Sequence, residues 1–470
     1  MQKQLYKLIF LCVTFFMLPN FSKAATYYVS PTGEASWPVC TNINVPCSAQ
    51  AGMSNAVAGD VVYFLDGIYS VIQNDPDYKI PALHPTNSGT AGNPIIFKSL
   101  NQHGANIHGI GATAEAYVST VLGSYHKNYI TWDGFLITAR NQADTVDIMV
   151  TLRVEADYCV IKNCEFVGGT HSQGGANNNA AISMNNASYL TIENNEIHEY
   201  KETSNNYNNN CINGYDSHHI VIKNNEIYEC TNGIHFKDNI DDSLIQDNYL
   251  HDNYVAFLNT NDNLDGACER NTLINNVIAG SKYMAMSVWD NINSAEYDER
   301  ADDLIFSNNT FYGNPNTNDQ AIGMDTTFAG HRPKFYNNII TGFNKSLGMS
   351  GADKEIAEAD HNQWGTSMLI NLHIYESNET TYNSIASWQG SDELEGNLSP
   401  GVGDLMSDPG FVNVSGNFSL LTDFALASNS FCRAAGREGL DMGADISSVG
   451  VFSSSTDLIA PSSPNGLSVM

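Results

Sequence analysis

One short pattern recurs along the sequence at intervals of a few tens of residues. In "HIVIKNNEIYEC", which begins at His219, two short apolar alternations flank the adjacent asparagines Asn224 and Asn225. The intervals between successive pairs run from 23 residues (Asn225 to Asn248) to 33 (Asn276 to Asn309). A repeat of this length is typical of a solenoid or a propeller. The second residues of the pairs are Asp133, Cys164, Asn195, Asn225, Asn248, Asn276, Asn309 and Asn338.

Each repeat holds several short stretches with period-two alternation, polar turn residues between them and no helical stripe. A leucine-rich repeat would show a leucine ladder and a helical half, and a propeller blade would need about 40 residues and four antiparallel strands. We therefore predict an all-β fold, a right-handed parallel β-helix. Asparagines at one corner of successive coils are expected to stack in a ladder, each side-chain amide binding the next.

The N-terminus has the pattern of a secretory signal. Lys3 and Lys7 precede the apolar run "LIFLCVTFFML", and the small residues Ser22 and Ala24 are spaced for cleavage. Residues 1–24 are therefore expected to be removed. No later apolar run is long enough to cross a bilayer, so we predict a secreted protein, extracellular or periplasmic.

The chain is strongly acidic. Removal of the signal lowers the count of basic residues from 21 to 18 while 51 acidic residues remain, which changes the net charge from -30 to -33. Such a surface argues against nucleic acid or an anionic membrane as a partner. It suits a saline medium, calcium binding, or simply a solvated acidic face.

Eight cysteines remain after the signal. Cys40 and Cys47 bracket "TNINVP" and are spaced to close a small surface loop. The cysteines within the coils fit buried thiols and disulfide bridges equally well. These are Cys159, Cys164, Cys211, Cys230 and Cys268.

Three zones follow the signal. Residues 26 to about 115 form an N-terminal cap in which "AQAGMSNAV" reads as a helix covering the open end of the solenoid. The coils fill about 116–345, and irregular rungs and a C-terminal cover fill about 346–450. Residues 451–470 have the Ser/Pro/Gly composition of a linker, and "APSSPNGLSV" resembles the start of a fibronectin type III module.

Several motifs carry a family resemblance. The stretches "YYVSPTG", "GDVVYFLDGIY", "SGTAGNPIIFKS", the coils and "DPGF" resemble secreted β-helix polysaccharide lyases of the family 9 pectate lyase and chondroitinase B types. The resemblance covers nearly all of the mature chain and implies a lyase on an extended polysaccharide. β-Helix glycoside hydrolases and epimerases share these features, so fold alone does not fix the activity.

Alternation within the strand before each corner predicts which side chains point outward. In "NGIHFKD", Ile234 and Phe236 face inward, so His235 and Lys237 face outward. Counting back from each doublet gives one outward column with two basic and two aromatic residues. Its members are Arg153, Asn185, Tyr215, Lys237, Asn259, Trp289 and Asp325.

β-Elimination on a uronate requires that the carboxylate be neutralised, that a base remove the α proton and that the leaving oxygen receive a proton. The segment "NGIHFK" resembles the one that carries the catalytic lysine in family 9 lyases, which implies Lys237 as the base. His235, which lies beside it, and Arg153, the second cation of the column, are predicted as further catalytic residues. Calcium is expected on Asp216, Asp238 and Asp262, because this ion prefers oxygen ligands.

The sequence departs from the family in two places. Only "DNIDD" and "NDNLDG" approach the dense aspartate cluster of the family 9 calcium site, and the Arg-His-Gly-Asn stretch of the chondroitinase type is missing. Arg300 and Arg332, past the same corner, are candidates to bind a substrate carboxylate through a bidentate fork, or else local aspartates.

Two other functions stay open. A glycoside hydrolase would use a pair of carboxylates, for which Asp216, Asp238, Asp290 and Asp325 are available. A surface adhesin or carbohydrate-binding solenoid would use the aromatic residues and calcium without a catalytic group. The sequence does not identify the sugar, and a monomer is expected.

Overall fold

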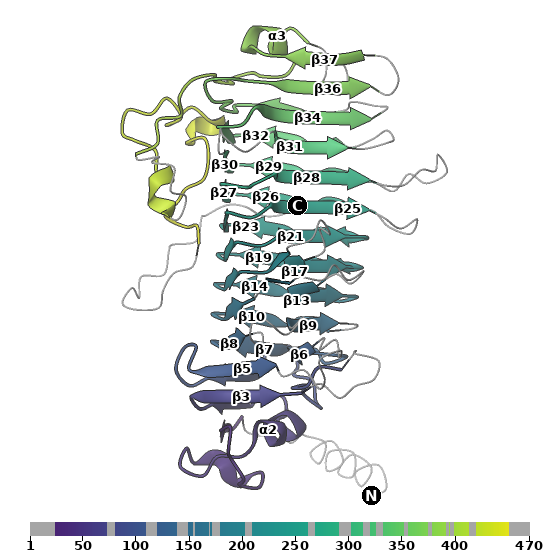
Figure 1. The fold of residues 1–470 in the computed structure, drawn as a ribbon, viewed down its shortest axis with the longest axis vertical. Coiled ribbons are helices and arrows are strands. Elements are labelled where there is room, and N and C mark those ends of the chain that lie inside the picture. The colour runs from purple at the N-terminus through teal and green to yellow at the C-terminus, as the bar shows by residue number, and fades with distance from the viewer. Residues whose placement is uncertain are drawn as a thin grey trace, which may run out of the picture.

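The computed structural model describes residues 24–72, 80–109, 120–138, 149–153, 156–168, 170–171, 179–202, 209–261, 268–290, 302–313, 320–325, 332–351, 356–374, 378–391, 394, 399–412 and 420–450. The chain winds into a column of stacked coils, and each coil contributes strands to long sheets that follow the axis of the column (Figure 1). We name the three long sheets A, B and C. Strand pairing within them is parallel except for one pair at the C-terminal end.

Sheet A contains twelve strands among the described residues. In spatial order they are β1 (Thr26–Val29), β2 (Val61–Phe64), β4 (Ile95–Ser99), β7 (Ile130–Asp133), β10 (Val160–Lys162), β14 (Thr191–Glu193), β19 (Val221–Lys223), β23 (Leu244–Gln246), β26 (Thr272–Ile274), β29 (Ile305–Ser307), β32 (Lys334–Tyr336) and β35 (Glu358–Asp360).

Sheet B follows sheet A across the asparagine corner and has ten described strands. They are β3 (Gly67–Val71), β5 (Ala105–Gly109), β8 (Leu136–Thr138), β11 (Glu165–Val167), β15 (Glu196–His198), β20 (Glu226–Tyr228), β24 (Tyr249–His251), β27 (Val277–Ala279), β30 (Thr310–Tyr312) and β33 (Ile339–Thr341).

Sheet C has eleven described strands and ends in the antiparallel pair β36–β37. They are β6 (Thr120–Gly123), β9 (Met149–Arg153), β13 (Asn179–Asn185), β17 (Asn209–Tyr215), β21 (Asn232–Lys237), β25 (Val255–Asn261), β28 (Met284–Asp290), β31 (Gln320–Asp325), β34 (Lys345–Gly351), β36 (Ile370–Ile374) and β37 (Asn378–Tyr382).

Short elements complete the description. Two two-stranded sheets pair β12 (Thr170–His171) with β16 (Lys201–Glu202) and β18 (Ser217–His218) with β22 (Ile240–Asp241). The helices are α2 (Ala49–Asn55), α3 (Ile385–Gln389) and the 3₁₀ turns η1 (Val39–Thr41), η2 (Leu421–Phe424) and η3 (Arg437–Gly439).

The core lies inside the coils because alternate residues of each short strand point inward. In sheet A, Ile192, Ile222, Ile245 and Leu273 are paired in register and are almost completely buried. Their neighbours on either side within each strand are partly exposed. The all-β prediction and the parallel β-helix are therefore confirmed.

The predicted asparagine ladder is confirmed in detail. Asn225 donates from its backbone nitrogen and from Nδ2 to Oδ1 of Asn248, at 3.0 and 2.9 Å, and Nδ2 also donates to the carbonyl of Ile192 at 2.9 Å. The pattern repeats from Asn195 to Asn362, and every one of these asparagines is fully buried. Asp404 ends the ladder by accepting from the backbone nitrogen of Asn362 at 2.7 Å.

From Asn163 to Asn337, the first residue of each doublet turns the corner in the left-handed backbone region, which asparagine and aspartate tolerate well. These outer side chains hold the C-terminal segment along the corner. Asn224 donates to the carbonyl of Ser448 at 2.6 Å, and Asn337 accepts from the backbone nitrogen of Arg437 at 2.7 Å. The predicted C-terminal cover is thus attached to the same corner that the doublets form.

The predicted N-terminal helix is also present. Helix α2 is capped by Ser48, whose side chain accepts from the backbone nitrogen of Ala51, and it lies at the N-terminal end of the column (Figure 1). A Cβ at Gly52 would come within 3.1 Å of Val62 and 3.2 Å of Val29, so the helix packs closely on the first rung. The zone expected as a cap also supplies β1 to β5, so the regular sheets begin there.

The cysteines show both outcomes that the sequence left open. Cys40 and Cys47 form the predicted disulfide, and Cys211 and Cys230 form a second one between neighbouring coils. Cys159, Cys164, Cys268 and Cys432 are buried free thiols.

The expected signal (1–24) falls outside the described residues except for Ala24, and the expected linker (451–470) lies entirely outside them. Across the part of the chain that is described, no helix has the length and apolar character needed to span a membrane.

Candidate functional site

The outward column on sheet C is the candidate site. Tyr215 and Arg153 both pair with Asn185. Farther along, Trp289 pairs with Thr260 and with Asp325. Apart from Asn259, the predicted members therefore lie on one line of strand positions that crosses neighbouring coils.

One member of the predicted column is misplaced. Asn259 pairs with Phe236 and Val288, two core residues, and Lys237 pairs instead with Thr260. The Asn259 side chain is 1% exposed, and its Nδ2 has no hydrogen-bond partner among the described residues. The prediction counted backward along the sequence from Asn276 and failed, because the coil gains residues after β25. In the structure, backbone pairing with β21 sets the register of β25.

Part of the prediction falls outside the description. Asp262 and Arg300 are not among the described residues, and for Arg153, Trp289 and Asp325 the description covers only the backbone. Their side-chain roles remain predictions.

His235 is held firmly beneath the surface of this face. Its Nδ1 lies 3.1 Å from Oδ1 of Asn210, and its Nε2 lies 2.8 Å from Oγ1 of Thr260. Since an amide oxygen only accepts, Nδ1 carries a proton and donates to Asn210, and Nε2 shares a hydrogen bond with the Thr260 hydroxyl. With 4% of its surface exposed, His235 is placed to orient Thr260, the residue paired with Lys237.

Lys237 is half-buried at the end of β21. Its Nζ lies 5.9 Å from the centre of the Tyr215 ring on the preceding coil. This distance permits a weak cation–π attraction. An amine and an aromatic face are therefore presented side by side on adjacent coils.

Two of the three predicted calcium ligands occupy equivalent positions after β17 and β21. The backbone nitrogen of Asp216 donates to the carbonyl of Asp238 at 2.8 Å, and both residues have positive φ. Asp216 is exposed, whereas Asp238 is 3% exposed. Carboxylate oxygens suit calcium, which takes six to eight oxygen ligands. The described residues contain no group of three His, Cys, Asp or Glu side chains able to hold a metal ion.

Arg332 lies at the corner between sheets C and A. It is exposed and forms an ion pair with Asp303 at 2.6 Å. This contact corresponds to the local aspartate pairing that the sequence left open for this residue.

A second cluster of titratable side chains lies on sheet B. Glu165 is 3.1 Å from His103 and 3.7 Å from His198, and these two rings hold the pKa of the carboxyl at about 2. One coil on, Tyr228 donates to Glu196 at 2.8 Å. His198 and Tyr228 each lie on the coil that follows the carboxylate they meet, whereas His103 precedes β5 on an earlier coil. The cluster therefore links coils and leaves little free chemistry.

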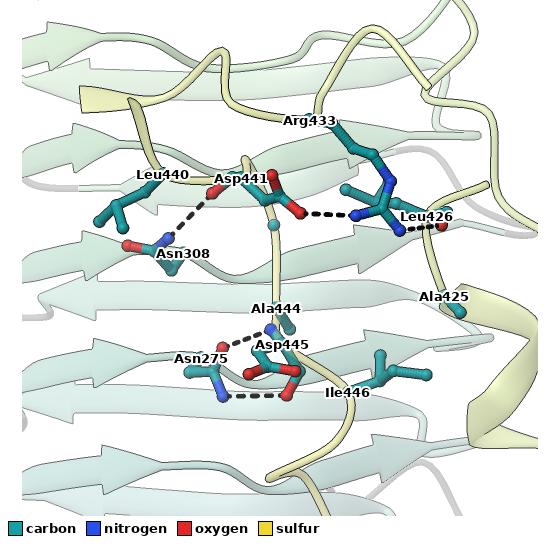
Figure 2. Close-up of a pocket in the computed structure, with 11 residues that line it drawn as sticks. Asn275, Asn308, Ala425, Leu426, Arg433, Leu440, Asp441, Ala444, Asp445 and Ile446 are labelled. Atoms are coloured by element: carbon teal, nitrogen blue, oxygen red, sulfur yellow. Dashed lines mark hydrogen bonds and ion pairs between the residues drawn. The ribbon is translucent and has the colours of Figure 1, made fainter. Parts of the chain in front are cut away.

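A cavity of about 410 Å³ lies where the C-terminal cover crosses the asparagine corner (Figure 2). Its polar groups bind one another: Asn308 donates to the carbonyl of Asp441, and Arg433 pairs with the Asp441 carboxylate at 3.3 Å and donates to Leu426. Because these groups are already paired, we regard the cavity as part of the attachment of the cover.

Several residues of the sheet C face were not predicted as members of the site. Asn213 is fully buried, accepts from Ser183 at 3.0 Å and leaves Nδ2 without a partner among the described residues. Asn210, which fixes His235, and Thr260 were also missed. The forward interval from Asn225 to Asn248 places Thr260 opposite Lys237, so this signal was present in the sequence.

The comparisons with known proteins agree with the architecture. Residues 126–294 match the Beta_helix family, a right handed beta helix region. Together with the three parallel sheets, this match identifies the chain as a right-handed parallel β-helix protein. No curated protein sequence matches the chain at a significant level.

Several solved structures are similar in fold. Pectate lyase Pel9A is 15% identical, with 90% of this chain and 96% of that chain covered and a TM-score of 0.49. A rhamnogalacturonan lyase is 14% identical over 81% and 87%, with a TM-score of 0.45. The A-module of mannuronan C-5 epimerase AlgE4 from Azotobacter vinelandii is 14% identical over 67% and 87%, with a TM-score of 0.40. The function is therefore argued from the side chains.

Proposed function

We propose that this protein is a polysaccharide lyase that cleaves a uronic acid polysaccharide by β-elimination on the outer face of sheet C. The observation that carries the proposal is the setting of Lys237, a half-buried amine beside the Tyr215 ring on a strongly acidic protein. Arg153, the other basic residue of the column, would hold a polyanion where most of the surface repels it.

The length of the column suits a polymer. From Asn185 through Tyr215, Lys237, Thr260, Trp289 and Asp325 the column crosses five coil intervals, about 24 Å at the spacing of paired strands. An extended polysaccharide laid across the coils would meet a different side chain at each step. Tyr215 would stack on a sugar face, and Arg153 would bind a uronate carboxylate through its fork.

In the proposed reaction Lys237 acts as the base. Its neutral amine takes the proton from the carbon next to the carboxylate, a carbon–carbon double bond forms, and the bond to the glycosidic oxygen breaks. The ammonium formed on Lys237 then returns a proton to the leaving oxygen. We assign His235 a positioning role, because it is buried and acts on Lys237 through Thr260.

Calcium completes the proposal. The ion, held by Asp216, Asp238 and Asp262, would neutralise the uronate carboxylate and so make the neighbouring proton more acidic. The side chain of Lys237 would approach the same sugar from the strand that precedes Asp238.

The test compares product release by the wild-type protein, Lys237→Met and Lys223→Met on pectate and alginate. Ultraviolet absorbance reports the unsaturated product, and a reducing-sugar assay reports every cleavage. Lys223 is a matched control because it lies on sheet A, paired with Glu193 at 3.0 Å.

We expect Lys237→Met to lower the rate of absorbance increase about 10²- to 10⁴-fold, the usual contribution of acid–base catalysis. Lys223→Met should leave the rate unchanged. Full activity of folded Lys237→Met would exclude Lys237 as the base. Reducing ends without absorbance would instead indicate a hydrolase, for which Asp216 and Asp238 on adjacent coils are the first pair to test.

A further inference from the structure

A group of basic side chains lies at the N-terminal end of sheet C, beyond the predicted column. The group consists of His84, His126 and Lys127, and Arg153 begins the column on the next coil. In a chain with 21 lysines and arginines against 51 acidic residues, such a gathering is unusual.

The strand register places His84 on the outer face. Leu83 bridges to Leu122, and both residues are buried in the core. Gly123 pairs with Thr151 of β9. Since side chains alternate, His84 points outward beside Gly123.

The same alternation of side chains determines the direction in which Tyr125 points. Ser124 points inward, where it accepts from Nε1 of Trp132 at 3.1 Å. Tyr125 therefore points outward, in line with Arg153 on the following coil. The outer face of sheet C thus extends one coil past the column that the sequence predicted.

The rings at this end lie close together. The centroids of His84 and Tyr125 are 6.4 Å apart, and those of Tyr125 and His126 are 4.2 Å apart. Nδ1 of His84 is buried and has no hydrogen-bond partner among the described residues. A buried polar atom without a partner is costly unless something binds it.

The charged side chains close to His84 are positive. Burial, and then the positive charges of Lys127 and His126, lower the pKa of His84 to about 4. Positive potential thus collects at a place where the chain also leaves a polar nitrogen without a partner. An anion would relieve both.

We propose that His84, His126 and Lys127 form an anion-binding subsite that holds a carboxylate- or sulfate-bearing sugar of the polysaccharide, far from the point of cleavage. The subsite rests on the proposed function, because it requires the polysaccharide to lie along sheet C. Four coil intervals separate Tyr125 from Lys237, about 19 Å. Only an oligosaccharide long enough to span that distance would reach both.

The test measures the affinity of uronate oligosaccharides of increasing length by calorimetry, with Lys237→Met present in every protein so that no substrate is consumed. The added variants are Lys127→Met and His84→Asn. Lys98→Met is the matched control, because Lys98 is a partly exposed lysine on sheet A, paired with Asp133 at 2.9 Å. Melting temperatures check that each variant is folded.

We expect Lys127→Met to weaken the binding of long oligosaccharides about five- to tenfold, the effect of one charge-assisted contact. Short oligosaccharides should bind all variants alike, and a neutral glycan of the same length should bind weakly throughout. Parallel titrations with sulfated oligosaccharides show which anion the subsite accepts. If Lys127→Met unfolds, His84→Asn takes its place and should weaken the long ligands selectively.

Two results would overturn the subsite. Equal losses of affinity in Lys127→Met and Lys98→Met would mean that net charge alone causes the effect. Unchanged binding of long oligosaccharides in both Lys127→Met and His84→Asn would exclude the subsite and leave the proposed cleavage at Lys237 unaffected. Absence of binding by every anionic oligosaccharide to the parent protein would overturn the subsite and the proposed function together.

Discussion

The asparagine corner and the outer face of sheet C are built from similar polar residues but differ in how these are used. At the corner, Asn225 makes the same set of hydrogen bonds as Asn248 and Asn276, and the arrangement repeats along the ladder from Asn195 to Asn362. On sheet C, equivalent positions carry Asn185, Tyr215 and then a lysine. The face also contains a buried amide nitrogen, Asn213 Nδ2, without a partner among the described residues.

This difference separates stability from function. A group repeated on every coil and fully hydrogen-bonded has nothing left to offer a ligand, so its role is to hold the coils in register. A face whose residues change from coil to coil can present a different contact to each sugar of a polymer. We therefore expect changes at the corner to affect folding and changes on sheet C to affect binding and turnover.

The largest effect on stability is expected at the corner. Asn195→Ala removes the acceptor for the backbone nitrogen of Cys164 and two hydrogen bonds donated by Nδ2, all at 3.0 Å and all buried. We expect a loss of about 3–5 kcal/mol in the free energy of unfolding, measured by denaturant titration.

Its neighbour in the same doublet is the control. Asn194 has positive φ and points away from the ladder, so Asn194→Gly should change stability by less than about 0.5 kcal/mol. Similar losses for both variants would mean that the inner asparagine has no special role.

Removal of calcium should lower activity and leave stability almost unchanged, the reverse of the effect expected at the corner. With a chelator we expect product formation to fall about a hundredfold, because the uronate charge is no longer neutralised. The melting temperature should change little, since the ladder contains no metal ligand among its asparagines. Unchanged turnover in chelator would remove calcium from the proposal.

A smaller effect is expected from Tyr215→Ala on sheet C. Loss of the ring should weaken polysaccharide binding by about 1–2 kcal/mol, roughly tenfold, through lost stacking. Binding can be followed by calorimetry in the Lys237→Met background. Tyr312→Ala on sheet B is a useful control, because its ring packs against Phe424 of the cover, and it should leave the affinity unchanged.

The smallest effect is expected on sheet B and depends on pH. The pKa of Glu165 falls to about 2 beside His103, whose own pKa is raised mainly by the same hydrogen bond. The carboxylate contributes stability above its unfolded pKa of about 4.5, and this is lost as pH falls toward 2. His103, whose pKa is raised in the folded state, contributes stability below about pH 6.5. This contribution is lost as the pH rises through the folded pKa of His103.

Glu165→Gln should therefore lower the free energy of unfolding most between about pH 4.5 and 6.5. The loss should be at most about 1 kcal/mol, because the pair is partly exposed to solvent. A double-mutant cycle with His103→Asn gives the coupling energy directly. A coupling that is equal at pH 5 and pH 9 would contradict the assignment to this ion pair.

The repeated features could be predicted from the sequence because one physical cause recurs in every coil. The inner asparagines, the inward apolar residues and the disulfide between Cys40 and Cys47 follow from periodicity and short spacing. The link between Cys211 and Cys230 could not be predicted, because it depends on which coils are neighbours in space.

The sheet C face was predicted less completely. Asn259 was placed outward by a count that an insertion had shifted, and Thr260 occupies the position opposite Lys237. The partners of His235 come from two other strands, so no local pattern reveals them. The docking of the C-terminal cover joins residues about a hundred or more positions apart, beyond the reach of any repeat count.

The central claim is that the polysaccharide lies along the outer face of sheet C. A crystal structure of Lys237→Met with a long uronate oligosaccharide tests it most directly. We predict sugar density that crosses the coils from β13 to β28 and touches Tyr215 and Thr260. Density on sheet A or B, or in the cavity under the C-terminal cover, would contradict the account.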